Sequence, residues 1–348
     1  MTSHHKAFHS RDVRVIQYGL GMIGVACARA ILETEGLALA GAVDVDSRKA
    51  GRPLHEILGP GGPAAHSRLR VAASLREALG GRRADIVLHT TQSSFGTIFP
   101  QVKECLEAGL SVVSSTEELA LPFATDPDLA RKLDAIARRK KVALLGTGVN
   151  PGFVMDILPI VAAAASRDVR HVRIERVLDA GSRRASFQRK VGVGLTPYEV
   201  ERRLRAGGFG HVGLLESALL VASGCDLHLD RIREESHPII AGRAMDSAFG
   251  RVRRGQVAGL HQSLSGLRKG VEILRLDVVM ALGVTDPHDA ATIDADPPVR
   301  LRLEGGLPGD TATIAALLNA IPRVLGAPPG LHTALDLPLP RPATRSRS

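Results

Sequence analysis

The clearest chemistry in this 348-residue chain lies in a set of spaced glycines and a pair of adjacent carboxylates. Gly19, Gly21 and Gly24 follow the pattern Gly-x-Gly-x-x-Gly, and Glu117 and Glu118 stand side by side. In a dinucleotide-binding loop the first glycine allows a tight turn, the second lets the backbone approach a pyrophosphate, and the third lets helix and strand pack closely. A carboxylate could transfer a proton or stabilise a cation. The pattern therefore indicates an NAD(P)-dependent enzyme.

The glycine pattern has the context that such a loop requires. Val13–Tyr18 is predicted as a strand, residues 22–35 as a helix, and Leu37–Val43 as a second strand. The first N–H groups and the positive end of the helix would hold the pyrophosphate. The loop residues expected to contact the cofactor are Gly19, Leu20, Gly21, Met22, Ile23 and Gly24. The alternative is a strand–helix turn that binds no ligand.

The end of the second strand bears on the choice between NAD and NADP. Asp44 could accept hydrogen bonds from the adenosine ribose hydroxyls, which favours NAD. Arg48 and Lys49 follow it and could bind a 2′-phosphate, which favours NADP, while Asp46 could simply cap a turn. The preference between NAD and NADP therefore stays open, and these residues are compatible with the use of both.

Polar residues also follow the strand predicted at residues 84–89. Thr90, Thr91 and Gln92 come directly after it, and ligands of parallel sheets bind beyond the carboxyl ends of the strands. We expect these three residues to lie along the ribose and nicotinamide. The alternative is a hydroxyl-rich N-cap for the helix predicted from Phe95.

Glu117 and Glu118 follow another strand of the same sheet, predicted at residues 110–115. This position places a catalytic acid or base near the expected nicotinamide. The alternative is ordinary helix design, with Thr116 as the N-cap and the two acids in the first turn.

The first half of the chain alternates short apolar strands with helices. Beyond the elements already named, helices are predicted at residues 95–108 and 127–139 and a strand at 142–145. This alternation predicts an α/β fold with a Rossmann-type parallel sheet covered by helices on both faces.

The second half has longer strands and fewer helices. Strands are predicted at residues 172–178, 257–264 and 271–282, with helices at 197–205 and 211–222. This pattern indicates an α+β domain built on an antiparallel or mixed sheet.

The expected domain boundary is the Gly/Pro-rich turn at residues 146–152. A dinucleotide-binding domain would span 13–150 and an α+β domain 151–308, followed by a C-terminal helix and segment over 309–338 that pack back towards the first domain. The tails, 1–12 and 339–348, lack apolar periodicity and are expected to be disordered.

The last helix is predicted over residues 309–321. Asp310 or Thr311 would serve as its N-cap, and Pro322 would stand near its end.

Composition narrows the function classes. The formal net charge is +9, of which the two tails carry +4, and aromatic residues make up 3% with no Trp. The remaining +5 suits an enzyme that binds phosphates or an anionic substrate better than a nucleic-acid-binding protein. No apolar run is long enough for a membrane span and no secretory signal is visible, so a cytoplasmic protein is expected.

Cysteine and histidine usage favours neither a thiol nucleophile nor a metal site. Cys27, Cys105 and Cys225 lack the spacing of a disulfide framework or a metal centre, and none has the setting of a catalytic thiol. The histidines are scattered without metal-ligand spacing, so no metal is expected.

Several further motifs are similar to those of the 2,4-diaminopentanoate dehydrogenase and native amine dehydrogenase family. The similarity runs from about Val13 to Pro338. The motifs that carry it are Gly19–Gly24, Thr116-Glu-Glu-Leu119, Gly146-Thr-Gly-Val-Asn-Pro-Gly-Phe153, Arg183-Arg184, Phe187-Gln188, Lys190-Val-Gly-Val-Gly-Leu195, Gly309-Asp-Thr-Ala-Thr313, Asn319-Ala-Ile-Pro-Arg323 and Ala327-Pro-Pro-Gly330.

The resemblance implies an architecture similar to dihydrodipicolinate reductase, with the second domain shaping the substrate pocket and a homodimer interface. It implies NAD(P)H-dependent reductive amination of a ketone or aldehyde with ammonia, or the reverse oxidative deamination. A glutamate after the fifth strand would be catalytic, which is Glu117 or Glu118 here. The paired-His segment of dihydrodipicolinate reductase and the Glu-Lys-Pro motif of related sugar dehydrogenases are both absent.

Four residues are expected to contact the substrate. They are Asn150, Phe153, Gln188 and, by the resemblance, Thr313. The basic residues Arg183, Arg184, Arg189 and Lys190 could hold an anionic substrate or a cofactor phosphate, or could form a solvated face. Because the chain has no Trp, aliphatic side chains would shape the pocket where relatives use aromatic ones.

Two other functions remain open. One is an NAD(P)H-dependent carbonyl or imine reductase that incorporates no ammonia. The other is a nonenzymatic dinucleotide-sensing protein. Nucleic-acid and membrane partners are not expected.

Overall fold

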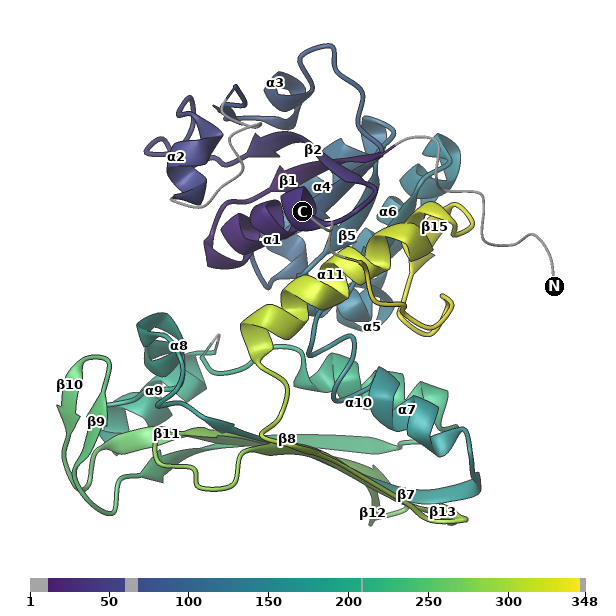
Figure 1. The fold of residues 1–348 in the computed structure, drawn as a ribbon. Coiled ribbons are helices and arrows are strands. Elements are labelled where there is room, and N and C mark those ends of the chain that lie inside the picture. Colours follow the sequence, from purple (N-terminus) through teal and green to yellow (C-terminus); the bar gives the residue numbers. More distant parts are fainter. Residues whose placement is uncertain (1–11, 60–67, 208, 345–348) are drawn as a thin grey trace. The chain divides into compact units, whose positions relative to one another are not determined.

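The computed structural model describes residues 12–59, 68–207 and 209–344. The chain forms two compact units (Figure 1): residues 1–149 with 309–348, and residues 150–308. No helix in the described ranges is both long and apolar enough to cross a membrane.

The first unit is built on a seven-stranded parallel sheet in the order β15-β6-β5-β4-β1-β2-β3. Its strands are β1 (Val13–Tyr18), β2 (Leu37–Val43), β3 (Val71–Ala72), β4 (Ile86–His89), β5 (Ser111–Ser114), β6 (Ala143–Gly146) and β15 (Gly330–His332). Its helices are α1 (Met22–Glu33), α2 (Leu54–Leu58), α3 (Leu75–Leu79), α4 (Phe95–Glu107), α5 (Pro122–Thr125), α6 (Pro127–Lys140) and α11 (Gly309–Leu325), with a 3₁₀ turn, η2, at Glu117–Ala120.

Apolar strand residues point to both faces of this sheet, and each face carries its own core. Cys27 and Ile31 of α1 pack with Leu317 and Ile321 of α11 on one face. On the other face, residues of α3, α4 and α6 pack together. The predicted Rossmann-type parallel sheet is therefore confirmed.

The last helix starts at the predicted residue but differs from the prediction in its N-cap and in its C-terminal end. It begins at Gly309, so Asp310 and Thr311 lie in its first turn, and it continues through Pro322 to Leu325. A proline inside a helix removes one backbone hydrogen bond. Burial of Ile321 and Val324 on either side of Pro322 compensates for that loss.

The second unit is built on a six-stranded mixed sheet in the order β14-β13-β7-β12-β11-β8, plus a two-stranded hairpin. The sheet strands are β7 (Arg167–Asp179), β8 (Arg231–Ile240), β11 (Val257–Arg268), β12 (Val271–Ala281), β13 (His288–Asp296) and β14 (Val299–Glu304), and the hairpin strands are β9 (Met245–Ser247) and β10 (Gly250–Val252). Only β7 and β12 run parallel among its neighbouring strands. Its helices are α7 (Ile157–Ala163), α8 (Ala185–Lys190), α9 (Pro197–Ala206) and α10 (Leu214–Gly224).

The predicted α+β unit is confirmed, although β8, β13 and β14 were not anticipated. β8 is polar over residues 233–237 and contains Pro238, which an edge strand tolerates. A buried ion pair joins two of the central strands, with Arg176 Nη1 of β7 2.9 Å from Asp289 Oδ1 of β13.

Candidate active site

The glycine-rich loop is tightly packed at Gly19 and Gly24 and has free space at Gly21. Gly19 has a φ of +88°, which favours glycine. A Cβ on Gly24 would lie 1.9 Å from the Gly19 carbonyl oxygen, whereas a Cβ on Gly21 would meet nothing within 4 Å. Helix α1 has neither a side-chain N-cap nor an acidic residue in its first turn. Its first N–H groups therefore suit a pyrophosphate, so the loop fits a dinucleotide.

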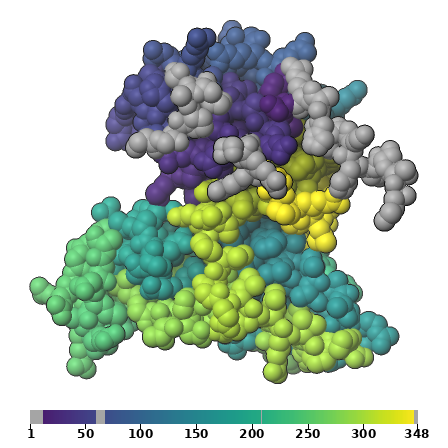
Figure 2. Space-filling model, viewed as in Figure 1, coloured from purple at the N-terminus to yellow at the C-terminus, as the bar shows by residue number. Residues whose placement is uncertain are grey.

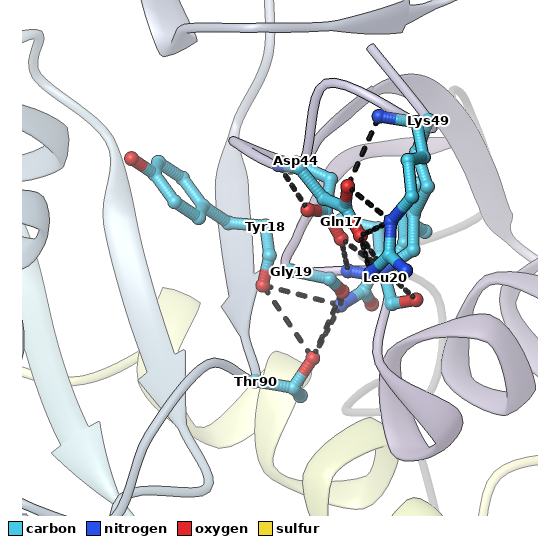
Figure 3. A network of polar contacts seen from close by, with 9 residues as sticks. Gln17, Tyr18, Gly19, Leu20, Asp44, Lys49 and Thr90 are labelled. Atoms are coloured by element: carbon cyan, nitrogen blue, oxygen red, sulfur yellow. Dashed lines mark hydrogen bonds and ion pairs between the residues drawn. The ribbon is translucent and has the colours of Figure 1, made fainter. Parts of the chain in front are cut away.

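A buried glutamine holds this loop against β4 (Figure 3). Gln17 Nε2 donates to the Gly19 carbonyl at 2.9 Å and to Thr90 Oγ1 at 2.8 Å. The Thr90 hydroxyl in turn donates to the Gly19 carbonyl at 3.1 Å. The predicted cofactor contact Thr90 is thus a buried brace of the loop in this structure, and its direct contact with a ligand stays a prediction.

Asp44 at the end of β2 is engaged with the loop and with Lys49 (Figure 3). Asp44 Oδ2 accepts the Leu20 N–H at 2.8 Å and lies 2.9 Å from Lys49 Nζ. Despite burial, which acts the other way, hydrogen bonds from the Asp46 N–H, Lys49 and the Leu20 N–H lower the pKa of Asp44. Its charge is therefore balanced by an ammonium at the site where an adenosine ribose would lie.

Arg48 stands beside this pair with its side chain 87% exposed, and its guanidinium contacts only Asp46 among the described residues. The hydrogen bonds from Arg48 lower the pKa of Asp46 to about 2. Arg48 is free to turn towards a 2′-phosphate because an exposed ion pair of this kind contributes little, about 0–1 kcal/mol.

A buried polar network continues from β4 to β5. His89 Nε2 lies 2.8 Å from Gln101 Oε1, and its Nδ1 lies 3.0 Å from Ser114 Oγ. Thr91 donates its hydroxyl to Gln101 Oε1 at 2.9 Å. Gln92, in contrast, exposes its side chain and uses only its backbone carbonyl, which accepts the Thr116 hydroxyl at 2.7 Å.

Glu118 caps a helix, although a different one from the helix expected. Its Oε2 accepts the N–H of Phe95, the first residue of α4, at 2.6 Å. The N-cap residue of α4, Ser94, makes no side-chain capping bond. Thr116 likewise does not cap the η2 turn. A carboxylate at a helix N-terminus is stabilising, so the geometry gives Glu118 a structural role.

Glu117 differs from its neighbour in having a half-buried carboxylate with no hydrogen bond or ion pair to any described residue. The turn that carries it sits directly on β6. A Cβ on Gly146 would lie 2.3 Å from the Leu119 carbonyl. Close packing against β6 therefore fixes the backbone of the turn, while the Glu117 carboxylate remains available for chemistry.

Thr313 lies in the same unit, on α11. Its Oγ1 accepts the N–H of Val149, just beyond β6, at 3.4 Å. This places the hydroxyl at the carboxyl-end edge of the sheet, the edge that also carries Glu117. Its contact with a substrate stays a prediction.

Asn150 and Phe153 belong to the second unit. The Asn150 amide donates to His211 Nε2 at 3.0 Å and accepts the Ser217 hydroxyl at 3.1 Å. That hydroxyl also contacts the fully buried Asp156 carboxylate at 2.8 Å. The side chain of Asn150 is thus fixed by this network, while Phe153 is half-buried.

Gln188 is also in the second unit and is almost completely buried. Its Nε2 donates to the carbonyls of Ala180 and Arg183 at 2.9 and 3.0 Å, and its Oε1 accepts the Ala248 N–H at 2.9 Å. These bonds satisfy both ends of the amide, so it ties α8 to the β9–β10 hairpin. Substrate contact by Asn150, Phe153 and Gln188 stays a prediction.

The roles of four residues that shape the site were not anticipated from the sequence. Gln17 interrupts the apolar run of β1, His89 and Ser114 end their strands, and Gly146 ends β6. A polar residue inside a predicted buried strand is the signal that could have revealed Gln17, because such a group needs a partner.

His89 makes the stability of the protein dependent on pH. Burial lowers its pKa from 6.5 to about 4, against the hydrogen bond to Gln101. Below pH 6.5 the unfolded chain binds a proton that the folded chain excludes, so the free energy of unfolding should fall as the pH drops towards 4. The contribution is about 3 kcal/mol at most. Urea unfolding at pH 7 and pH 4.5 would measure the loss.

The control for this prediction is an exposed histidine of the same unit. His89→Gln should make the drop in unfolding free energy smaller, whereas His55→Gln on the surface of α2 should leave it unchanged. In His89→Gln, His211 should still lower the free energy of unfolding at acidic pH, since burial also lowers the pKa of His211 to about 3. Equal profiles for His89→Gln and the wild type would show that His89 is not the group responsible.

The fold and the site together define a class of protein. A glycine-rich loop opens α1 at the carboxyl edge of a parallel sheet, and an unpartnered carboxylate lies two strands away at the same edge. This is the arrangement of a nicotinamide-dependent oxidoreductase with a second, sheet-based unit.

Comparisons with known proteins narrow the class. Residues 153–347 match the model of the 2,4-diaminopentanoate dehydrogenase C-terminal domain. Over 336 residues, 94% of each chain, the sequence is 30% identical to a 2,4-diaminopentanoate dehydrogenase of Acetoanaerobium sticklandii. It is 23% identical to an amine dehydrogenase of Streptomyces virginiae over 58% of this chain and 61% of that one. The chain therefore belongs to the 2,4-diaminopentanoate dehydrogenase family, as predicted.

Solved structures show the same fold. An amine dehydrogenase from Mycobacterium smegmatis superposes with a TM-score of 0.82 at 24% identity, covering 96% of this chain and 98% of that one. GenD2 from gentamicin A biosynthesis, solved in complex with NAD, gives a TM-score of 0.51 at 19% identity over 87% of this chain and 75% of that one.

Proposed function

We propose that the protein is an NAD(P)-dependent amine dehydrogenase that converts a ketone or aldehyde and ammonia into an amine, or runs the reverse deamination. The observation that carries the proposal is the free carboxylate of Glu117, placed beyond β5 in a member of this family. Relatives named for amine and diaminopentanoate oxidation support it.

Glu117 has the chemistry that this reaction needs. When bound, the nicotinamide cofactor donates or accepts a hydride at the substrate carbon. Glu117 would accept a proton from ammonia as the carbon–nitrogen bond forms and would return it to the carbinolamine hydroxyl, which leaves as water. The carboxylate would then stabilise the positive charge on the iminium nitrogen that remains. Glu118 cannot serve equally well while its carboxylate holds the N-terminus of α4.

An assay of ketones and aldehydes with and without ammonia tests the proposal. Oxidation of NADH or NADPH that requires both the carbonyl compound and ammonia is expected. Oxidation at the same rate without ammonia would favour the alternative of a carbonyl or imine reductase. Binding of the cofactor with no turnover on any substrate would favour a dinucleotide sensor.

Dual use of NAD and NADP follows from the Asp44–Lys49 pair. Lys49→Met should leave the Asp44 charge unbalanced, which repels a 2′-phosphate and retains the hydrogen bonds to a ribose. The ratio of kcat/KM for NADPH to that for NADH should fall about tenfold, equivalent to 1.4 kcal/mol. Steady-state kinetics with both cofactors would measure it.

Lys103→Met is the matched control, because it removes a lysine paired with Glu107 on the exposed side of α4. It should not change the cofactor ratio. An unchanged ratio in Lys49→Met as well would show that Lys49 does not set the preference.

A homodimer in the cytoplasm is part of the same proposal and rests on the family resemblance. Light scattering coupled to size-exclusion chromatography would give the mass in solution, and twice the chain mass of 36.9 kDa is expected.

A further inference from the structure

A second site of a different kind lies entirely within the second unit. It is a cavity of about 430 Å³, within the range of small-molecule sites. The cavity lies between the end of α8, the last turns of α9 and the β9–β10 hairpin, a segment that reaches the surface in green in Figure 2. Its lining residues are Arg189, Val193, Gly194, Leu195, Arg203, Ser247, Phe249, Gly250, Arg251, Val252 and Gln256.

The lining is cationic, and Glu199, one turn before Arg203 on α9, interacts with Arg203 electrostatically from outside it. It contains three arginines, from three different elements, and no Asp or Glu. None of the three guanidiniums forms an ion pair with a described acidic residue. Like charges gathered in one cavity repel each other unless an anion is present.

Aromatic rings support two of these guanidiniums in place of carboxylates. Arg189 lies 4.5 Å from the centre of the Phe249 ring, and Arg203 lies 5.8 Å from that of Phe209. A cation–π contact orients a guanidinium while leaving its charge and its N–H groups available. Of the two rings, Phe249 belongs to the lining of the cavity.

The other polar side chains of the lining are already satisfied. Ser247 donates to the Gly250 carbonyl at 2.7 Å. Gln256 donates to the Gly194 carbonyl at 2.8 Å and accepts the Arg253 N–H at 2.6 Å. The arginines are therefore the groups left to bind a ligand, and they would select an anion.

The walls of the cavity are fixed before any ligand binds. Gln188 ties α8 to the hairpin through the Ala248 N–H, and the Gly194 N–H donates to the Val257 carbonyl at 2.9 Å. Pre-formed walls lower the ordering cost of binding.

The distribution of charge along the chain agrees with this location. Between residues 183 and 256 there are thirteen Lys and Arg against eight Asp and Glu. This excess equals the whole +5 that the chain carries outside its tails, and three of the thirteen cations, Arg189, Arg203 and Arg251, line the cavity.

We propose that this cavity binds a small polyanion, with Arg189, Arg203 and Arg251 contacting clustered phosphate or carboxylate groups. Guanidiniums bind both oxyanions in a bidentate manner, and three of them match a ligand with two or more negative charges. The predicted catalytic residues, the glycine-rich loop and the four predicted substrate contacts do not line the cavity. Of the four basic residues that the sequence offered for an anionic substrate or a cofactor phosphate, Arg189 alone is in the lining. The site therefore goes beyond the proposed dehydrogenase reaction.

Isothermal titration with pyrophosphate and, separately, citrate tests the proposal and distinguishes phosphate from carboxylate ligands. One equivalent of at least one probe should bind the wild type, more weakly as salt is added. Arg189→Gln combined with Arg251→Gln should weaken binding at least tenfold. Arg254→Gln removes one of the basic residues of the same region outside the lining and should leave binding unchanged.

Gly21→Ala separates this site from the glycine-rich loop, which could itself bind pyrophosphate. Binding that survives Gly21→Ala and is lost in the arginine variant supports the cavity. Three results would overturn the proposal: no saturable binding of either probe, equal weakening in Arg254→Gln, or loss of binding only in Gly21→Ala. A change of oligomeric state in the arginine variant without anion binding would also overturn it, because the arginines would then contact another protein chain.

Discussion

Glu117→Gln is expected to lower kcat for ammonia-dependent reduction of a carbonyl compound by about 10²–10⁴-fold, the usual contribution of a positioned acid or base. The amide keeps the size of the side chain but can neither accept a proton nor balance a cation. Because Glu117 has no partner among the described residues, its replacement should leave the fold and the affinity for NAD(P)H nearly intact. Steady-state kinetics and fluorescence titration of the cofactor would measure the two effects separately.

Glu118→Gln is the matched control, one residue along the same turn. It removes the charge from the bond to the Phe95 N–H, so the free energy of unfolding should fall by about 1 kcal/mol while most of the activity is kept. The reverse pattern, with Glu118→Gln inactive and Glu117→Gln active, would assign catalysis to Glu118. Full activity in both variants would remove this turn from the mechanism.

Gly24→Ala is expected to abolish detectable cofactor binding, raising the Kd for NAD(P)H by at least 100-fold, about 2.7 kcal/mol. The new Cβ would lie 1.9 Å from the Gly19 carbonyl oxygen, which Gln17 and Thr90 hold from the other side. The loop must therefore move, and its N–H groups leave the positions that face a pyrophosphate. A lower unfolding temperature should accompany the loss.

Two other glycines separate the effect on the loop from a general effect of added methyl groups. Gly21→Ala adds a Cβ in open space, so the protein should fold normally and still bind the cofactor poorly because the methyl group blocks the pyrophosphate. Gly96→Ala, also in open space but on α4, should leave binding unchanged and raise stability by about 0.5–1 kcal/mol. Unimpaired binding in Gly24→Ala would contradict the assignment of the loop.

The longer strands and helices of the first unit were predictable because their signals are local, whereas the short elements α2, β3, α3, α5 and β15 were not predicted. Apolar strands such as β2 and helices such as α6 carry the right periodicity and end at turn residues, so their predicted bounds lie within a residue or two of those observed. β8 was not anticipated, since an edge strand needs little apolar pattern. The predicted end of the final helix, before Pro322, was too early, because the packing that stabilises the helix beyond this proline depends on residues distant in sequence.

The site was predictable in its residue types and less so in their roles. Spacing alone could not separate Glu117 from Glu118, because the N–H that Glu118 accepts belongs to Phe95, on another helix. Likewise, the pairing of Asp44 with Lys49 depends on how the loop after β2 folds back. The first contact joins residues 23 positions apart, and the second joins neighbours whose meeting depends on the conformation of a loop. A single sequence holds little information on either.

The central claim is that ammonia becomes the nitrogen of the product and that Glu117 carries the proton chemistry. The most direct test is to incubate the enzyme with NAD(P)H, a panel of ketones and aldehydes, and ammonia labelled with the heavy nitrogen isotope, and to analyse the products by mass spectrometry. Labelled amine formed by the wild type and by Glu118→Gln, but not by Glu117→Gln, is the predicted result. An alcohol or unlabelled product, or labelled amine formed equally by Glu117→Gln, would contradict the claim.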